Sequence, residues 1–268
     1  MGGQGYRVAR WPPGSTCRPG QGRGACWWAV VLPKGCVAWA TGGVCNGRSV
    51  QVGIVGGTGP AGRGVASRLA AAGLSVTLGS RDEARAAAVA EGVVGRWPEH
   101  ELDVVGASNE QAARSELVVV ATPWEATVAT LAPLVDALAD KVVVSMVNAM
   151  AKAGRELLPL VPPRGSMAAT VQAALPHSAV AATFHHLPAA DLEDLTRDLD
   201  ADVLVCADDA GAATVTAELV DSIEGLQAVV AGSLAQASAV EAFTAVLVSV
   251  NIRNKAHASL RLTGLHRE

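Results

Sequence analysis

A glycine-rich turn between residues 56 and 62 contains the residue types that bind a nucleotide diphosphate. Gly57, Gly59 and Gly62 stand in the spacing G-x-G-x-x-G, directly after the apolar run Val52–Gly56 and before an Ala-rich stretch. Glycines at these positions permit a tight turn, a backbone that touches a pyrophosphate, and a helix packed closely on its strand. The phosphates would bind free N–H groups at the positive end of that helix. Because such a turn alone is weak evidence, the residues after it decide its meaning.

The end of a second expected strand, Ser75–Gly79, favours NADP over NAD. An NAD-binding protein usually has Asp or Glu there to bind the ribose 2′-hydroxyl, whereas this chain has Ser80 and Arg81. A hydroxyl and a guanidinium can bind a 2′-phosphate dianion, which a carboxylate would repel. Arg85 follows Arg81 by four residues, so both cations lie on one face of a helix. The sequence therefore predicts a 2′-phosphate site at these three residues; two solvated surface arginines are the alternative.

Strand and helix signals alternate along residues 51–268, which predicts a Rossmann-like α/β fold. We expect one unit with a doubly wound, mainly parallel sheet, an integral C-terminal α/β extension and a long final helix. The expected strands are Val52–Gly56, Ser75–Gly79, Asp103–Gly106, Glu116–Thr122, Lys141–Val147, Ala179–His185, Asp202–Ala207 and Leu226–Ala231. The expected helices are Ala61–Ala72, one opened by Asp82, Asn109–Ser115, one beginning at Pro123-Trp124, Met167–Leu175, Ala210–Ile223 and Leu234–Lys255.

The last expected helix has apolar residues at intervals of three or four, namely Val240, Phe243, Leu247 and Val250. This spacing predicts that these residues lie on one buried face. The same helix is a candidate contact for a homodimer. The proline-rich stretch before the helix at Met167 is expected to form a loop.

Residues 1–50 differ from the rest of the chain in charge and composition. They carry six of the 21 Lys and Arg residues, none of the 25 Asp and Glu residues, and four of the five cysteines. Gaps of eight or nine residues separate these cysteines, unlike the short paired spacing of a zinc module. We interpret residues 1–50 as a disordered or spurious extension; a secretory signal and a disulfide module are the alternatives. Residues 51–268 then form the predicted NADP-binding Rossmann-type domain.

The acidic balance of residues 51–268 restricts the partners of the protein. With 15 basic against 25 acidic residues, this region is poorly suited to bind nucleic acid or an anionic membrane. Cys206 is its one cysteine, which is typical of a reducing cytoplasm. No apolar run of membrane-spanning length is free of charges and turn signals. We therefore expect a cytoplasmic protein with no nucleic acid or membrane partner. Asp208 and Asp209 precede a helix and are expected to cap it, so no metal site is predicted.

The glycine turn is the first of a series of short motifs along the chain. They are Gly56-Gly57-Thr58-Gly59, Gly79-Ser80-Arg81, Thr122-Pro123-Trp124-Glu125, Phe184-His185-His186-Leu187-Pro188-Ala189, Val205-Cys206-Ala207-Asp208-Asp209, Ile223-Glu224-Gly225-Leu226, Ala231-Gly232-Ser233-Leu234 and Asn254-Lys255-Ala256-His257. Together they resemble the NADPH-dependent coenzyme F420 reductases over roughly residues 51–265. The P-W-E, H-x-x-P-A and C-x-D-D elements are far more specific than the glycine turn. The resemblance implies reversible hydride exchange between NADP(H) and the deazaflavin coenzyme F420.

The resemblance also implies roles for single residues. It places Thr58, Gly59, Pro60 and Ala61 at the NADP diphosphate, Ser80, Arg81 and Arg85 at the 2′-phosphate, and Thr122, Asn148 and Ala189 nearer the nicotinamide. Beside the deazaflavin ring it places His185, Leu187 and Thr244. His185 is the candidate catalytic residue, because an imidazole with an unperturbed pKa near neutrality can donate a hydrogen bond or a proton. A buried structural histidine is the alternative.

The chain departs from the family pattern at two places near the second cofactor. Asn148-Ala149-Met150 stands where relatives commonly have a Pro-rich turn, and Ala242 stands where some have a hydroxyl. Both departures concern the shape of the slot for the second cofactor. They leave the prediction of an NADP site unchanged.

Two other functions remain open from the residues themselves. One is an NADP-dependent reductase of another acceptor, such as a flavin-assisted metal reductase or an imine reductase. The other is a non-enzymatic module that binds NADP(H) and reports its redox state to a partner. Hydride transfer between two bound carriers needs little covalent help from the protein. The alanines at 179–190 and 235–245 suit a slot for two rings, and they equally suit close packing of helix on sheet.

Overall fold

The structure is a computed structural model, and it describes residues 29–32, 35–38, 50–154 and 156–265. The interpretation of residues 1–50 as an extension lies mostly outside these ranges and stays a prediction. The described strands in that region are β1 (Ala29–Leu32) and β2 (Gly35–Ala38), which pair antiparallel.

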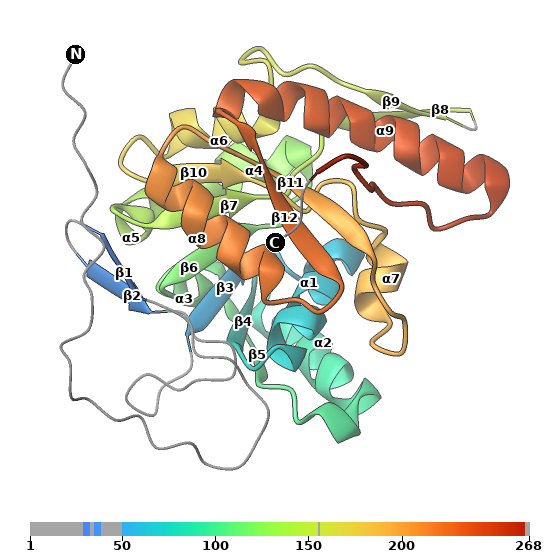
Figure 1. Cartoon of the computed structure of the whole chain (residues 1–268). Helices are drawn as coiled ribbons and strands as arrows, with labels where there is room; N and C mark the ends of the chain where they lie inside the picture. Colours follow the sequence, from blue (N-terminus) through green and yellow to red (C-terminus); the bar gives the residue numbers. More distant parts are fainter. Residues whose placement is uncertain (1–28, 33–34, 39–49, 155, 266–268) are drawn as a thin grey trace, which may run out of the picture.

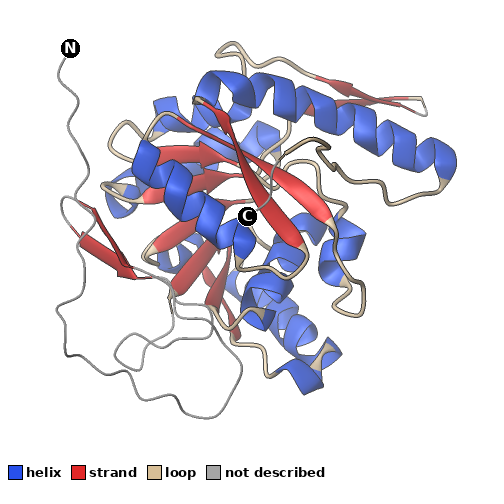
Figure 2. Ribbon diagram, viewed as in Figure 1, coloured by secondary structure: helices blue, strands red, loops and turns tan. Residues whose placement is uncertain are grey.

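An eight-stranded sheet in the order β12-β11-β10-β7-β6-β3-β4-β5 forms the centre of the molecule (Figures 1 and 2). Its strands are β3 (Gln51–Val55), β4 (Ser75–Ser80), β5 (Val104–Ser108), β6 (Leu117–Val120), β7 (Val142–Ser145), β10 (Ala179–Ala182), β11 (Ala201–Ala207) and β12 (Leu226–Gly232). The strands from β5 across to β10 are parallel. β11 pairs antiparallel with β10 and parallel with β12. The expected mainly parallel, Rossmann-like sheet is confirmed.

Helices cover both faces of this sheet (Figure 2). One face carries α1 (Pro60–Ala71), α2 (Glu83–Arg96), α7 (Ala189–Glu193) and α8 (Ala210–Asp221). The other carries α3 (Asn109–Ala112), α4 (Thr127–Leu131), α5 (Val135–Leu138), α6 (Met167–Ala174) and α9 (Ala237–Asn254). Single 3₁₀ turns are η1 (Pro98–His100), η2 (Trp124–Ala126), η3 (Ala132–Leu134) and η4 (Leu234–Gln236). Strand side chains alternate between the two cores: Val52 and Ile54 pack under α1, and Val55 packs on the opposite face.

The strand expected at Ala179–His185 is shorter in the structure. β10 ends at Ala182, and Phe184 adopts a left-handed backbone with φ of 64°. A bulky residue in that conformation cannot continue a strand. His185 and His186 therefore lie in a turn beyond the carboxyl end of β10.

A hairpin occupies part of the segment where a loop is expected. β8 (Met150–Ala153) and β9 (Glu156–Pro159) pair antiparallel. Neither strand contains a β-branched residue, so their sequences do not indicate strands. The hairpin instead packs along α9 (Figure 1), where the Leu157 N–H donates to Ser249 Oγ at 3.4 Å.

The final helix, α9, buries only part of the expected face. Val240 and Leu247 are buried as expected, but Phe243 and Val250 are 37% and 38% exposed. By length and composition alone, Leu234–Asn254 is the one described stretch that could cross a membrane. In the structure its inner side packs on the sheet core and on the hairpin. The absence of a membrane partner stays a prediction.

Two polar residues occupy the inner face of α9 because each finds a hydrogen-bond partner there. The Glu241 carboxylate accepts from the Met167 N–H at 2.7 Å and the Ala168 N–H at 2.9 Å, so it caps α6. The Thr244 hydroxyl donates to the carbonyl of Val240 at 3.1 Å. Burial raises the pKa of Glu241 to about 7.

The two acidic residues after β11 serve as helix caps. Asp209 Oδ1 accepts from the Ala212 N–H at 2.7 Å and caps α8, as expected. Asp208 Oδ1 accepts from the Leu234 N–H at 2.9 Å. Asp208 therefore caps η4, which lies further along the chain, and not α8, which follows it directly.

Candidate functional site

A cavity lies at the carboxyl ends of β3, β4 and β6, where ligands bind in open α/β sheets. Its volume is about 330 Å³, within the range of roughly 300–1,000 Å³ that is usual for small-molecule sites. The residues that line it are Gly56, Thr58, Gly59, Pro60, Ala61, Gly62, Ser80, Arg81, Arg85, Asn109, Ala121, Thr122, Pro123, Ala126 and Thr130. The structure thus brings the residues predicted for the diphosphate and the 2′-phosphate to one space, together with Thr122.

Gly62 and Gly59 suit their positions in the turn for different physical reasons. A Cβ at Gly62 would lie 2.5 Å from the carbonyl oxygen of Gly57, so the close packing of α1 on the turn excludes a side chain there. A Cβ at Gly59 would meet no atom within 4 Å. No side chain caps α1, so its first N–H groups are available to a ligand or to solvent. An open glycine at an uncapped helix N-terminus fits a diphosphate.

The 2′-phosphate candidates follow β4 in a tight turn. The Asp82 N–H donates to Ser80 Oγ at 3.1 Å, so the Ser80 O–H is free to donate. Asp82 Oδ1 in turn accepts from the Arg85 N–H at 3.1 Å and caps α2. Arg81 and Arg85 are exposed and have no ion-pair partner among the described residues. A buried hydroxyl beside two unpaired guanidinium groups suits a dianionic phosphate.

Asn109 is a cavity residue that the sequence analysis missed. Its Oδ1 accepts from the Gly56 N–H at 3.0 Å, in the part of the turn where Gly56 has φ of 71°. Ser108 and Gln111 form a capping box that starts α3 and places Asn109. The S-x-x-Q spacing was the available signal. It identifies a helix start without indicating that the next side chain supports the glycine turn.

Thr122, just beyond the end of β6, packs against Gly56 of the glycine turn. A Cβ added to Gly56 would lie 2.5 Å from Thr122 Cγ2. The Thr127 hydroxyl donates to the carbonyl of Pro123 at 3.0 Å. Because the Thr122 and Thr127 hydroxyls lie 2.8 Å apart, Thr122 is the donor of that second bond. Its oxygen can still accept a hydrogen bond from a ligand.

A second polar group lies at the carboxyl ends of β7 and β10. Asn148 Nδ2 donates to the backbone carbonyl of His185 at 3.1 Å, which links a residue predicted for the nicotinamide with one predicted for the deazaflavin. Both ring nitrogens of His185, Asn148 Oδ1 and Ser145 Oγ are buried and have no hydrogen-bond partner among the residues that the structure describes. Unpaired buried polar atoms are costly. Their concentration here fits a region whose polar groups are satisfied by a ligand.

Burial changes the acid–base properties of His185 from those of a free imidazole. Burial, with a smaller contribution from neighbouring His186, lowers the pKa of His185 to about 3. The ring is therefore neutral at pH 7, where it can donate one N–H and accept at the other nitrogen. Burial likewise lowers the pKa of His186 to about 4. His186 Nε2 accepts from the Leu204 N–H at 3.3 Å, so His186 has a structural partner.

The remaining predicted residues lie outside the cavity of the glycine turn. Leu187 packs against the core, Ala189 is the first residue of α7, and Thr244 is buried on α9. Within the described part of the chain, no hydrogen bond joins Thr244 to His185. The structure therefore groups one set of predicted residues in a cavity and distributes the other over a turn, a short helix and a long helix.

Comparison with known proteins gives related sequences over most of the chain. Residues 51–149 match the family model described as NADP oxidoreductase coenzyme F420-dependent. The F420-dependent NADP reductase of Methanocaldococcus jannaschii is 34% identical over 222 residues, which cover 81% of this chain and 99% of that protein. The F420-dependent NADP reductase of Methanothermobacter thermautotrophicus is 34% identical over 227 residues, covering 81% and 96% respectively.

Solved structures show the same fold. A candidate F420-dependent NADP reductase from Arthrobacter sp. FB24 superposes with a TM-score of 0.62 at 27% identity, over 77% of this chain and 93% of that one. The hypothetical protein SMa0349 of Sinorhizobium meliloti superposes with a TM-score of 0.58 at 23% identity, over 74% and 92%. The second likeness concerns the fold alone.

Proposed function

The chain belongs to the family of F420-dependent NADP reductases, and from this premise we propose how its residues serve hydride transfer between NADP(H) and coenzyme F420. Bound NADP(H) and F420 supply the hydride chemistry themselves. The tasks left to the chain are to bind both, to orient them and to exclude water. The observation that carries the proposal is the cavity in which Gly59, Arg81 and Thr122 meet at the carboxyl ends of three parallel strands.

The NADP side is proposed to use the glycine turn and the end of β4. Thr58, Gly59, Pro60 and Ala61 offer the diphosphate an uncapped helix N-terminus. Ser80, Arg81 and Arg85 bind the 2′-phosphate, because one free O–H and two unpaired cations face no carboxylate partner. This charge arrangement favours NADP over NAD.

The acceptor side is proposed to use the groups at the ends of β7 and β10. The neutral His185 ring donates a hydrogen bond to the deazaflavin instead of acting as an imidazolium acid, since burial lowers the pKa of His185 to about 3. Leu187 and Thr244 contribute to the walls of the same slot. Thr122, Asn148 and Ala189 lie on the nicotinamide side, and the Asn148 bond to the His185 carbonyl joins the two halves.

The experiment that tests the activity is to mix the purified protein with NADPH and oxidised F420. We expect loss of the deazaflavin absorbance with NADPH, little with NADH, and the reverse reaction with NADP and reduced F420. Turnover only with a flavin or an imine would support another reductase. Binding of NADPH without any turnover would support a sensing module. Gly59→Ala tests the diphosphate site and should weaken NADPH binding without loss of stability, because its Cβ meets no atom of the described residues but enters the space proposed for the diphosphate.

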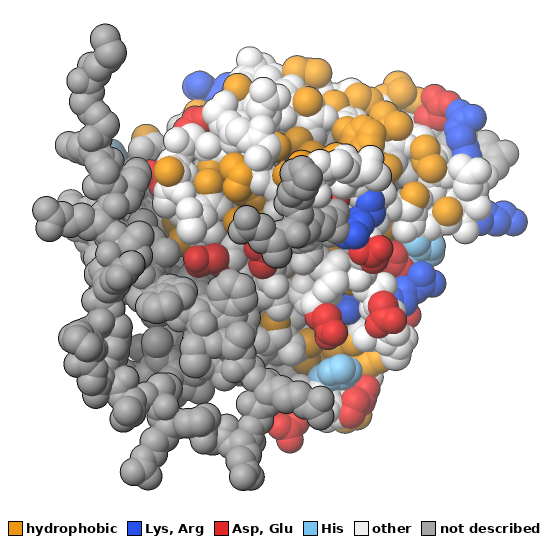
Figure 3. All heavy atoms as spheres, viewed as in Figure 1, with side chains coloured by type: hydrophobic (Ala, Val, Ile, Leu, Met, Phe, Trp, Pro, Cys, Tyr) orange, Lys and Arg blue, Asp and Glu red, His pale blue; other side chains and the backbone are white. Residues whose placement is uncertain are grey.

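We also propose that the protein is a homodimer through α9. Phe243, Val246 and Val250 form an exposed apolar stripe along this helix, with exposures of 37%, 53% and 38%. Apolar side chains gather over α9 in the space-filling view (Figure 3). Val246→Asp should shift sedimentation toward the monomer, whereas Val105→Asp, at an equally exposed position on β5, should leave it unchanged. A wild-type protein that sediments as a monomer would refute the proposal.

A further inference from the structure

The helix α7 needs contacts from elsewhere in the chain to hold its position. It is five residues long and follows directly after His185–Pro188, the segment proposed to meet both cofactors. A helix of this length is not stable by itself. Whatever holds α7 therefore also holds Ala189 and the preceding turn.

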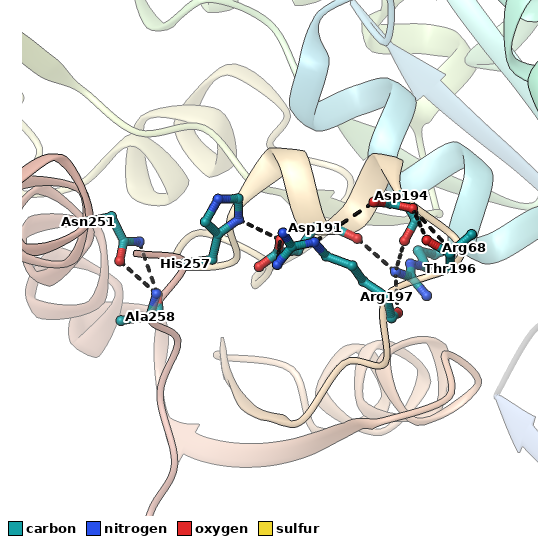
Figure 4. A network of polar contacts seen from close by, with 8 residues as sticks. All are labelled: Arg68, Asp191, Asp194, Thr196, Arg197, Asn251, His257 and Ala258. Atoms are coloured by element: carbon teal, nitrogen blue, oxygen red, sulfur yellow. Dashed lines mark hydrogen bonds and ion pairs between the residues drawn. The ribbon is translucent and has the colours of Figure 1, made fainter. Parts of the chain in front are cut away.

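Arg68 of α1 holds the C-terminal side of α7. Its guanidinium donates to the backbone carbonyls of Asp191, Leu192, Asp194 and Arg197, at 2.7, 3.2, 2.6 and 2.9 Å. The carbonyls lie in the last turn of α7 or beyond its end, where helical partners are missing. The Asp194 carbonyl also accepts from the Arg197 N–H at 3.1 Å. Figure 4 shows Arg68 reaching from α1 toward this group. One arginine thus joins the helix of the NADP turn to the last turn of α7.

Asp191 receives a second contact from the C-terminal tail. His257 Nδ1 lies 2.5 Å from Asp191 Oδ1, and Arg197 Nη1 lies 3.2 Å from the same oxygen. Figure 4 shows the His257 and Arg197 side chains both directed at Asp191. Asp191 is buried, so its hydrogen bonds are protected from solvent competition.

The tail is fixed on both sides of His257. Asn251 of α9 brackets Ala258 with two hydrogen bonds, Nδ2 to the Ala258 carbonyl at 3.1 Å and Oδ1 from the Ala258 N–H at 2.6 Å. Further along, the Asp202 N–H donates to the Leu260 carbonyl at 2.8 Å, which attaches the tail to β11. The tail therefore spans from the end of α9 to α7 as an ordered strap.

We propose that Asp191 and His257 are positioning residues whose hydrogen bond sets the separation of α7 from α9 and thereby the width of the slot for the deazaflavin. The inference rests on the proposed function, because Leu187, in the turn that leads into α7, and Thr244 on α9 are proposed walls of that slot. Neither Asp191 nor His257 is proposed to touch a cofactor. Their effect is on the acceptor side, while the cavity of the glycine turn stays as it is.

The test compares His257→Ala and Asp191→Asn with wild type in steady-state kinetics. We expect the KM for F420 to rise about tenfold, as for the loss of a hydrogen bond to a charged group. The dissociation constant of NADPH, measured by fluorescence without F420, should stay within about twofold. Amide hydrogen exchange over residues 185–193 should become faster in both variants, because α7 loses one of its two holds.

Two control variants make the result specific. His257→Asn places an amide N–H near the position of Nδ1 and should restore both the KM and the exchange rates. Arg261→Gln changes a tail residue whose ion pairs reach Asp200 and Asp202 instead of α7, and it should behave as wild type. Wild-type KM and wild-type exchange in His257→Ala would overturn the inference. Absence of turnover in wild type would refute the proposed function, and the exchange rates would still decide whether His257 holds α7.

Discussion

The two halves of the site are built in different ways. On the NADP side the helix caps are local: Asp82 caps α2 and Ser108 caps α3, each through a residue three positions along the chain. The bond from the Gly56 N–H to Asn109 Oδ1 spans 53 residues and is the exception. On the acceptor side the supporting hydrogen bonds are distant, because Arg68 meets the Asp191 carbonyl across 123 residues and Glu241 caps α6 across 74. The two arginines proposed for the 2′-phosphate are also exposed, whereas His185 is buried.

Because of this difference, we expect substitutions on the two sides to change different quantities, ligand affinity on the NADP side and stability on the acceptor side. Exposed arginines contribute little to folding, so changes on the NADP side should alter affinity in an intact protein. Buried polar groups with distant partners are costly to remove, so changes on the acceptor side should affect the fold first. The following variants test whether the two halves can be separated in this way.

Arg68→Met should have the largest effect, and it should be on stability. The change removes the side-chain donor to four backbone carbonyls in and after α7, of which the Asp194 carbonyl keeps the Arg197 N–H. We expect the free energy of unfolding to fall by about 4 kcal/mol, from loss of several hydrogen bonds to a buried charged group. Urea denaturation would measure it. The control is Arg81→Ala, an exposed arginine whose removal should change stability by less than about 0.5 kcal/mol. Equal stabilities for the two variants would contradict the comparison.

The double variant Ser80→Asp/Arg81→Ala should have the next largest effect, and this effect should be on the affinity for NADP. A carboxylate would repel the 2′-phosphate, and one of two unpaired cations would be lost. We expect the NADP dissociation constant to rise between about tenfold and a hundredfold, with a smaller change for NAD. Isothermal titration with both nucleotides measures the ratio. An unchanged NADP affinity would refute the 2′-phosphate site, and a large loss of stability would show that the NADP side is not independent of the fold.

The sequence was sufficient to predict the glycine turn and the 2′-phosphate candidates because these residues are close in the chain, whereas Asn109, whose partner Gly56 is 53 residues away, was missed. The glycine spacing specifies the turn, and Ser80 and Arg81 follow β4 directly, so neither inference needs knowledge of distant contacts. The parallel sheet could be predicted for a related reason. Its central strands are buried on both faces, and continuous apolar runs such as Leu117–Val120 are typical of such strands.

The acceptor side could not be predicted in the same detail because distant contacts determine it. β10 stops early at the left-handed Phe184. The hairpin of β8 and β9 depends on packing along α9. The buried face of α9 includes Glu241, whose partners are the first N–H groups of α6. A buried carboxylate is not expected from apolar spacing alone, so the spacing predicted the burial of Val240 and Leu247 correctly and that of Phe243 and Val250 wrongly.

The pH dependence of stability should be smaller than these effects and should come from the acceptor side. The pKa of His185 falls from 6.5 to about 3 on burial. Below pH 6.5 the unfolded chain binds a proton at His185 and the folded chain does not, so the free energy of unfolding falls as the pH falls toward 3. Between pH 6.5 and pH 5 this contribution is about 2 kcal/mol. It should be absent from His185→Gln.

The measurement is the difference in unfolding free energy between wild type and His185→Gln, taken at several pH values. Glu241 titrates in the opposite sense, because burial raises its pKa to about 7 and its stabilising proton is lost as the pH rises from 4.5 through 7. Glu241 is present in both proteins, so its contribution cancels in the difference. A difference that does not change between pH 6.5 and pH 5 would show that His185 is accessible to protons in the folded state.

Ser108→Ala should have the smallest effect and sharpens the comparison from the NADP side. The Ser108 hydroxyl accepts from the Gln111 N–H at 3.3 Å in the capping box that begins α3. Loss of such a cap costs about 1 kcal/mol. Because α3 carries Asn109, whose Oδ1 accepts from the Gly56 N–H, the NADP dissociation constant should rise by about twofold to fivefold. Ser108→Asp keeps an N-cap acceptor and should restore both values.

The KM for F420 should not change in either variant, since α3 makes none of the contacts that hold α7. A matching rise in that KM would show that the glycine turn and the acceptor slot are coupled through the sheet.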